Sequence, residues 1–303
     1  MASVGQGRIA LVTAVAARDV DEDLPLITQA VARADATARV DIVDWDDPLV
    51  EWAGYGAVVV RSTWDYTTRI DEFRSWVDRV AAVSRLANPA ALIRWNSDKR
   101  YLADLATQGV AVIDATFVAP GQGAELPDAA EVVVKPVVGA GSRDAGRYRR
   151  SDTAGILAHV ARLHDRSEVA MIQPYISSVD RTGEAGLFFF GGVYSHAITK
   201  GPLLRLDAAP TRALFAPEQI GSRQASAVER AAAESVLAAL PHVSALSGAE
   251  LPPLYARVDL LADDVGTPVL LELEVCEPSL FLATSPGAAD RYVATVLEFA
   301  SRR

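Results

Sequence analysis

The sequence predicts an α/β protein, with a parallel sheet in its N-terminal part and antiparallel strands after it. Two observations support this class. Short apolar runs near the N-terminus alternate with amphipathic helical runs, a spacing typical of parallel sheets with right-handed crossovers. Nearer the C-terminus, the apolar runs 255–262 and 267–275 flank turn-forming residues, which predicts a β-hairpin. With 303 residues, the chain is long enough for two or three lobes.

Composition and charge exclude several classes of function. Hydrophobic residues make up 50% of the chain and charged residues 22%, which describes an ordinary folded protein. The net charge of −10 and the lack of any basic run argue against a nucleic-acid surface. No apolar run approaches the roughly 18 residues of a membrane span, and residues 1–8 lack the apolar segment of a signal peptide. We therefore expect a cytoplasmic protein that binds neither nucleic acid nor a membrane.

Cysteine and histidine usage gives little sign of chemistry. The single cysteine, Cys276, excludes an internal disulfide and agrees with a reducing cytoplasm. We interpret Cys276 as a small core residue rather than a nucleophile. The histidines show no metal-type pairing: His159 and His164 are expected at the surface, and His196 lies within a predicted strand, where contact with a ligand is an alternative to packing.

The first lobe contains a candidate binding edge. Its predicted elements are three strands and a helix after the first of them: 8–14, 40–44 and 55–61, with the helix at 24–34. Ligands of parallel sheets bind beyond the carboxyl ends of the strands, which places Arg61, Thr63 and Trp64 at that edge. Arg61 suits a substrate carboxylate by bidentate pairing, and the alternative is a surface loop with Trp64 tucked beneath it. No glycine fingerprint follows the first strand, so a dinucleotide site is not expected.

Lys99 and Lys135 occupy the ends of predicted elements in the middle of the chain. After a helix at 70–83, a second helix opens near residue 96 and runs to 107, with Lys99 in its first turn. A cation there opposes the helix dipole unless an anion lies nearby. A strand at 109–117 follows. The next predicted strand, at 131–134, is followed directly by Lys135.

A glycine-rich turn follows Lys135 directly. Gly139, Gly141 and Ser142 form a flexible turn whose amides could wrap phosphate oxygens. Such a turn alone is weak evidence for a phosphate site. A buried strand that ends in Lys-Pro and leads directly into the turn is stronger evidence. The spacing of a Walker A loop is absent. The remaining predicted elements are a helix at 153–164, a strand at 170–176, a hairpin at 188–199 that ends at Lys200, and helices at 225–239 and 291–301.

Acidic residues gather on the predicted C-terminal hairpin. Side chains spaced by two project from one face of a strand, so Arg257 with Asp259, and Glu272 with Glu274, each share a face. If those faces align, three carboxylates meet and repel one another unless a cation joins them. Carboxylate oxygens suit Mg²⁺ or Mn²⁺ held together with nucleotide phosphates. The alternative is a solvated outer face of the sheet.

Together, the lysines, the arginine, the carboxylates and the glycine-rich turn fit one nucleotide triphosphate, and their order resembles the ATP-grasp superfamily of carboxylate-activating ligases over nearly the whole chain. The resemblance implies a fold in which a parallel α/β lobe precedes two lobes that clamp ATP with Mg²⁺ or Mn²⁺. The implied ATP-binding residues are Lys99, Lys135, Gly139, Gly141, Ser142, Gln173, Tyr175, Ile176, Asp180 and Lys200. The implied metal ligands are Asp259, Glu272 and Glu274, and the implied catalytic cations are Arg257 and Lys200. Glu274 stands where many members have Asn.

Four runs are similar to a narrower family, the O-ureidoserine cyclo-ligases of D-cycloserine biosynthesis: VRSTWDY, IRWNSDKRYLADL, VVVKPVVGAGSRDAG and FGGVYSHAITK. That resemblance implies ATP-dependent closure of O-ureido-D-serine to D-cycloserine, with release of carbon dioxide, ammonia, ADP and phosphate. The alternatives are a ligase that joins a carboxylate to a separate amine, and a nucleotide-binding protein without turnover.

Position along the chain suggests further assignments. The expected domains are residues 1–90 on the substrate side, 91–175 as the lid lobe, and 176–303 with the metal site. The residues expected to contact an amino-acid-like substrate are Arg61, Thr63, Trp64, Glu277 and Ser279. A monomer or a homodimer is expected.

Overall fold

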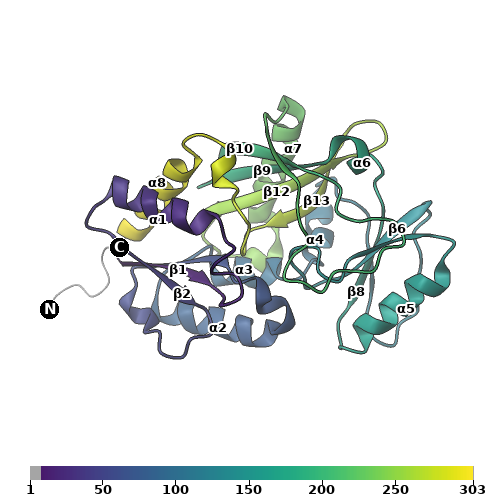
Figure 1. Ribbon diagram of the computed structural model, residues 1–303, viewed down its shortest axis with the longest axis horizontal. Coiled ribbons are helices and arrows are strands. Elements are labelled where there is room, and N and C mark those ends of the chain that lie inside the picture. Colours follow the sequence, from purple (N-terminus) through teal and green to yellow (C-terminus); the bar gives the residue numbers. More distant parts are fainter. Residues whose placement is uncertain (1–7, 303) are drawn as a thin grey trace.

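The computed structural model describes residues 8–302, which form three sheets with helices packed on them. In Figure 1 the purple N-terminal lobe lies at one end, the teal central lobe at the other, and the C-terminal sheet between them. The predicted α/β class is therefore confirmed. Among the described residues, no helix has the length and apolar character needed to cross a membrane.

The N-terminal sheet is parallel and has the order β2-β1-β3-β4. Its strands are β1 (Arg8–Thr13), β2 (Arg39–Asp44), β3 (Ala57–Ser62) and β4 (Leu86–Ala87). Helix α2 (Ile70–Val83) packs Phe73 and Trp76 against one face. Helix α1 (Asp23–Ala34) packs Leu24 and Ile27 against the other. Because β1 and β3 are covered on both faces, they read as continuous apolar runs in the sequence.

The central sheet is antiparallel, with the order β5-β8-β6-β7. Its strands are β5 (Thr116–Val118), β6 (Glu131–Pro136), β7 (Gly146–Arg149) and β8 (Ala170–Pro174). Helix α5 (Thr153–His164) covers one face through Ile156, Val160 and Leu163. The Asp152 side chain caps this helix by accepting a hydrogen bond from the Gly155 amide.

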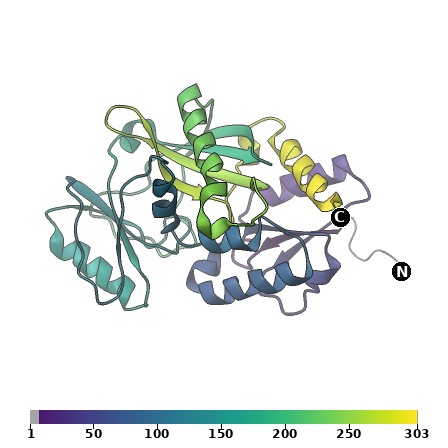
Figure 2. The ribbon, with the colours of Figure 1, turned by 180° about the vertical axis from the view of Figure 1, so that it is seen from behind.

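The C-terminal sheet is also antiparallel and has the order β11-β10-β9-β12-β13. Its strands are β9 (Glu184–Phe190), β10 (Val193–Lys200), β11 (Ile220–Arg223), β12 (Tyr255–Ala262) and β13 (Pro268–Glu274), with the short helix α6 (Val179–Thr182) before them. Helix α7 (Ala227–Ala239) crosses one face, as Figure 2 shows from behind. A capping box between Ser226 and Glu229 begins α7.

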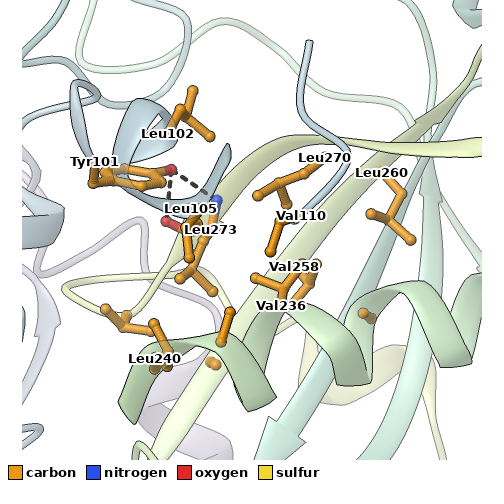
Figure 3. Packing of buried hydrophobic residues seen from close by; sticks show 14 of the residues in the cluster. Tyr101, Leu102, Leu105, Val110, Val236, Leu240, Val258, Leu260, Leu270 and Leu273 are labelled. Atoms are coloured by element: carbon orange, nitrogen blue, oxygen red, sulfur yellow. Dashed lines mark hydrogen bonds between the residues drawn. The ribbon is translucent and has the colours of Figure 1, made fainter. Parts of the chain in front are cut away.

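The two faces of strand β12 have different neighbours because its side chains alternate. Ala256, Val258 and Leu260 point toward α7 and join a core that includes Leu102 and Leu105 (Figure 3). Tyr255 points the other way, toward helix α8 (Ala288–Ser301), which lies beside α1. The C-terminal helix therefore packs between the first lobe and the last.

Two predicted elements near residue 100 are wrong in detail. The helix expected from about residue 96 to 107 is divided into α3 (Ala90–Asn96) and α4 (Tyr101–Thr107), with a turn at 97–100. The strand expected at 109–117 is reduced to β5, because Gly109 adopts a φ of +83° and Val112 pairs with Leu270 of β13 instead. Helix α4 thus packs on the C-terminal sheet, although residues 91–175 were expected to form the lid lobe.

The expectation that His159 lies at the surface is also wrong. His159 is 1% exposed, and its Nδ1 lies 3.0 Å from the hydroxyl of Tyr148. Burial lowers the pKa of His159 to about 4. Cys276 is buried in a core cluster, as expected of a small core residue. His196 is buried as well, stacked on Phe188 with ring centroids 4.3 Å apart, so it packs rather than contacts a ligand.

Candidate active site

A cavity of about 920 Å³ lies where the three lobes meet. Most of the residues singled out from the sequence line it: Trp64, Lys99, Lys135, Gly139, Gly141, Ser142, Gln173, Tyr175, Ile176, Lys200, Arg257, Asp259, Glu272, Glu274, Glu277 and Ser279. The described residues that line it do not include Arg61, Thr63 or Asp180. Side chains from positions 64 to 279 are therefore brought to one site.

Pairing of β12 with β13 aligns the acidic residues. Asp259 lies opposite Glu272 and Arg257 opposite Glu274 in the register of the two strands. All four side chains line the cavity, while the alternate residues of β12 face α7. The solvated-face alternative is thereby excluded, because Asp259 is 1% exposed.

Each of these acids is held by a cation. Lys99 Nζ lies 2.9 Å from Glu272, and it also donates to the Gly139 carbonyl oxygen at 2.6 Å. Lys200 Nζ lies 3.2 Å from a carboxylate oxygen of Asp259. Arg257 donates to Asp259 at 2.8 Å and also to Glu274. In the resulting network of alternating charges, Asp259, Lys200 and Arg257 are buried, whereas Glu272 and Glu274 are partly exposed to the cavity.

The network separates the pKa values of its members. Although burial opposes it, the charges of Arg257 and Lys200 lower the pKa of Asp259. Burial raises the pKa of Glu274 to about 8, and the neighbouring charges of Asp259 and Glu272 add to this effect. Glu274 is consequently the member of the network that holds a proton most readily.

Lys135 differs from the other two lysines. It projects from β6 into the cavity, and within residues 8–302 it makes no ion pair. Burial lowers its pKa. A lysine in such a place is available to an anionic ligand.

The donor set fits a divalent metal ion. Within the described residues, no group of three or more metal-type side chains is arranged around a common point, because the acids are turned toward their cations. Their oxygens are nevertheless the hard donors that Mg²⁺ and Mn²⁺ prefer, and they lie on paired strands of one hairpin. The charges of Asp259 and Glu272 add to the effect of burial in raising the pKa of Glu274, and a divalent cation shared by the three carboxylates would oppose that effect. Asp259, Glu272 and Glu274 therefore suit such an ion.

The far end of the cavity is formed by strand β8 and the residues after it. Gln173 is 2% exposed and donates its amide to the Ile113 carbonyl at 3.3 Å. Asp180 accepts a hydrogen bond from the Tyr175 hydroxyl at 2.7 Å and pairs with Arg147, away from the cavity lining. Asp180 thus adjoins Tyr175, which does line the cavity, and its expected contact with a ribose stays a prediction.

Glu184 is an acid of this site that the sequence analysis missed. It lines the cavity, and its carboxylate lies 2.8 Å from Lys200 Nζ. Burial raises its pKa to about 7. The hairpin predicted at 188–199 does not by itself reveal this contact, because Glu184 comes opposite Lys200 only after a register shift between Tyr194 and His196.

The expectation that Arg61 contacts substrate is corrected by its burial. Arg61 has no exposed surface, donates to the Pro278 carbonyl at 3.1 Å, and lies 3.5 Å from Asp23. Thr63 is equally buried. Trp64 does line the cavity, and its indole nitrogen donates to the Glu277 carbonyl at 3.0 Å. Arg61 thus supports the chain at Pro278 rather than reaching into the cavity.

The glycine-rich turn is covered by the long segment 201–219, which was also missed. Gly141 adopts a φ of +60° and accepts a hydrogen bond from the Ala216 amide at 2.9 Å. Phe215 from this segment meets Trp64 edge to face, with centroids 5.5 Å apart. The covering segment therefore joins the turn of the central lobe to the binding edge of the first lobe.

Comparisons with known proteins agree with this architecture. A sequence model of the family described as D-cycloserine synthetase DcsG, N-terminal domain, matches residues 9–88. The chain is 42% identical over 302 residues to the cycloserine biosynthesis protein DcsG of Streptomyces lavendulae, covering 96% of this chain and 98% of that protein.

Solved structures agree at two levels of similarity. The crystal structure of D-cycloserine synthetase DcsG superposes with a TM-score of 0.87 and 40% identity, covering 97% of this chain and all of that one. The D-alanine–D-alanine ligase of Bacillus anthracis complexed with ATP superposes with a TM-score of 0.64 and 14% identity, covering 97% of each chain. At that identity, the second similarity concerns the fold alone.

Proposed function

This chain belongs to the D-cycloserine synthetase family and has the ATP-grasp fold, and from this premise we propose that it closes O-ureido-D-serine to D-cycloserine with ATP. The observation that carries the proposal is the convergence of Lys99, Lys135, Lys200 and Arg257 with three carboxylates on one cavity. The expected products are D-cycloserine, carbon dioxide, ammonia, ADP and phosphate.

The first step activates the substrate carboxylate. A carboxylate resists nucleophiles because its charge and resonance are lost in the tetrahedral state. Transfer of the γ-phosphoryl group converts it into an acyl phosphate with a good leaving group, and this transfer needs alignment and charge neutralisation. Lys135 makes no ion pair with any residue between 8 and 302, so it contributes a positive charge to the phosphates. Lys200 and Arg257 lie next to Asp259, where the reacting oxygens would meet.

A divalent cation, Mg²⁺ or Mn²⁺, would be held by Asp259, Glu272 and Glu274 and would supply charge neutralisation on the phosphate oxygens. To bind it, these carboxylates must exchange their contacts with Lys99, Lys200 and Arg257. The cations so released would then be available to neutralise phosphate oxygens. Arg257 stays in place because it also donates to the Ser279 carbonyl at 3.1 Å.

The second step closes the ring. The ureido nitrogen bonded to oxygen attacks the acyl carbon, phosphate leaves, and the nitrogen loses its proton. The resulting five-membered ring still carries the carbamoyl group, which hydrolysis with one water converts to carbon dioxide and ammonia. The cover formed by Phe215 and the turn at Gly141 would exclude water until the ring has closed, because water would hydrolyse the acyl phosphate.

The test is ADP release with O-ureido-D-serine, with its L-isomer, and with D-serine plus free amines. We expect ADP with the single ureido substrate, and a product that lacks the carbamoyl group by mass spectrometry. ADP that appears only when an amine is added would identify an intermolecular carboxylate–amine ligase. Tight ATP binding without ADP release from any carboxylate would identify a protein without turnover.

A further inference from the structure

We propose that the Glu277 side chain recognises the ureido group of the substrate and is the residue by which the enzyme distinguishes O-ureidoserine from serine. This inference rests on the proposed function and deepens it. It concerns the segment 277–282, which follows β13 and lines the cavity at the side of the first lobe.

The backbone of this segment is held in place from several directions. The carbonyls of Glu277, Pro278 and Ser279 accept hydrogen bonds from Trp64, Arg61 and Arg257 in turn, at 3.0, 3.1 and 3.1 Å. The amides of Leu280, Phe281 and Leu282 all donate to the carboxylate of Asp23, at 2.6, 3.1 and 2.8 Å. A side chain mounted on such a segment has a defined position, which is what substrate recognition requires.

One oxygen of the buried Glu277 carboxyl has no partner within the protein's described residues. The residue is 8% exposed and lines the cavity, and its Oε2 has no hydrogen-bond partner among the described residues. It forms no ion pair there, whereas Asp259, Glu272 and Glu274 are each paired with a cation. Burial raises the pKa of Glu277, and the neighbouring Cys276 thiol and Tyr66 hydroxyl, which favour the ionised carboxyl, do not offset that effect. A carboxyl oxygen buried without a partner is costly, and a bound ligand with N–H groups removes that cost.

Glu277 fits a ureido group better than it fits an ammonium group. A planar carboxylate accepts two parallel N–H bonds from a planar urea. A protonated carboxyl donates to the urea oxygen and accepts one N–H, so the pairing survives in both protonation states. An ammonium group is matched only by the ionised form, and burial raises the pKa of Glu277, which disfavours that form.

One other buried carboxyl provides a comparison. Asp21, in the loop after β1, lines the cavity and is 5% exposed, and its Oδ2 also lacks a hydrogen-bond partner within residues 8–302. A substitution there tests whether any unpartnered acid of the cavity produces the same effect.

The experiment measures the dissociation constants of O-ureido-D-serine and D-serine by ligand-observed NMR in the presence of ADP and Mg²⁺. The two ligands share the carboxylate and the ammonium group and differ in the ureido group. For Glu277→Leu, we expect binding of O-ureido-D-serine to weaken by about tenfold or more, with D-serine binding unchanged within about threefold. Glu277→Gln, whose amide also pairs with a urea, should stay within about threefold of wild type for both ligands.

Asp21→Asn should leave the ratio of the two constants unchanged, and thermal melting with ADP shows that each variant is folded. The inference is overturned if Glu277→Leu weakens both ligands equally, if it weakens neither, or if the ratio changes only in Asp21→Asn. If the wild-type protein does not bind O-ureido-D-serine while it still binds ADP, the proposed function itself fails.

Discussion

Individual residues of the cavity act as pairs. Three pairs of opposite charge line it: Lys99 with Glu272, Lys200 with Asp259, and Arg257 with Glu274. Removing one partner from such a pair leaves the other buried and uncompensated. The same pairs can separate when phosphate and a metal ion bind, because the cations then pair with phosphate and the carboxylates with the metal ion.

Glu272→Gln tests the role of this carboxylate at the residue scale. The amide keeps the shape of the side chain but loses the charge that suits a metal ion, so ADP release should fall by about 10²–10³-fold. The measurement is steady-state ADP release at saturating Mg²⁺, with circular dichroism melting to show that the fold is retained. Asp264→Asn, the same change of charge at the exposed turn of the same hairpin, is the control and should retain activity. Full activity in Glu272→Gln would contradict the metal role.

Glu274 predicts how the stability of the metal-free protein depends on pH. Its pKa is about 8 in the folded protein and 4.5 as an ordinary carboxyl, so the folded state holds a proton that the unfolded chain releases. This stabilising contribution is fully present below pH 4.5 and is lost as the pH rises through 8. The unfolding free energy should therefore fall between pH 6 and about pH 8.5.

Urea unfolding in EDTA at several pH values measures this dependence. Glu274→Gln should show a shallower fall. The part that remains comes from the other carboxyls whose pKa is raised, among them Glu184 with a pKa of about 7, and Glu277. Equal slopes for the two proteins would show that Glu274 is ionised throughout this range.

At the scale of elements, the outer edge of β13 is closed by a backbone bridge from Val112 to Leu270 and, nearer its C-terminal end, by side chains. The Tyr101 hydroxyl donates to the Leu273 carbonyl at 3.0 Å and accepts from the Leu273 amide at 2.8 Å (Figure 3). Asn96 donates to the same carbonyl and accepts from the Val275 amide. These contacts fix the backbone on either side of Glu274, and they protect an edge that would otherwise be open to pairing.

Tyr101→Phe tests this closure. The change removes one hydroxyl and leaves the Leu273 amide buried without its partner, so the unfolding free energy should fall by about 1–3 kcal/mol. Urea denaturation monitored by fluorescence measures it. Tyr194→Phe is the matched control, because that half-buried tyrosine packs beside Arg230 through its ring. Its unfolding free energy should change little. Similar losses in both variants would argue that the Tyr101 hydroxyl has no special role.

At the scale of the whole molecule, the cavity exists only because three lobes are held together. Helix α8 packs against α1 and the C-terminal sheet, and Asp23 of the first lobe holds the segment after β13. On the other side, the turn at Gly141 meets the segment that carries Phe215. A change at this meeting point should affect the closed site more than the stability of any single lobe.

Gly141→Ala tests that contact. A Cβ at this position would lie 2.5 Å from the Phe215 Cβ, and the φ of +60° is unfavourable for alanine. The turn must move, so the rate of ADP release should fall by up to about 10²-fold, as expected when reacting groups are misplaced by about 1 Å. Gly123→Ala, in an open loop of the same lobe, is the control and should behave as wild type. Unchanged kinetics in Gly141→Ala would show that the turn closes without this contact.

Local patterns predicted most of the secondary structure. Helices α2 and α5 have the predicted bounds, and β12 does as well, because an amphipathic period or an apolar run reports burial within a few residues of itself. The strand expected at 109–117 failed because Val112 pairs with Leu270, a partner far away in the sequence. The prediction that His159 lies at the surface is wrong for a similar reason. Its two ring nitrogens make hydrogen bonds with the Tyr148 hydroxyl and the Asp144 carbonyl inside the protein.

The sequence by itself determined which charged groups this protein carries at the ends of its elements, because their order along the chain reproduces that of a known family. Only the tertiary structure decided which of them meet. It directed Arg61 into the protein to support Pro278, turned Asp180 toward Tyr175, and brought Glu184 to Lys200. The physical reason is that spacing along a chain fixes the face on which a side chain lies, whereas its partner and its desolvation depend on contacts between segments far apart in the sequence.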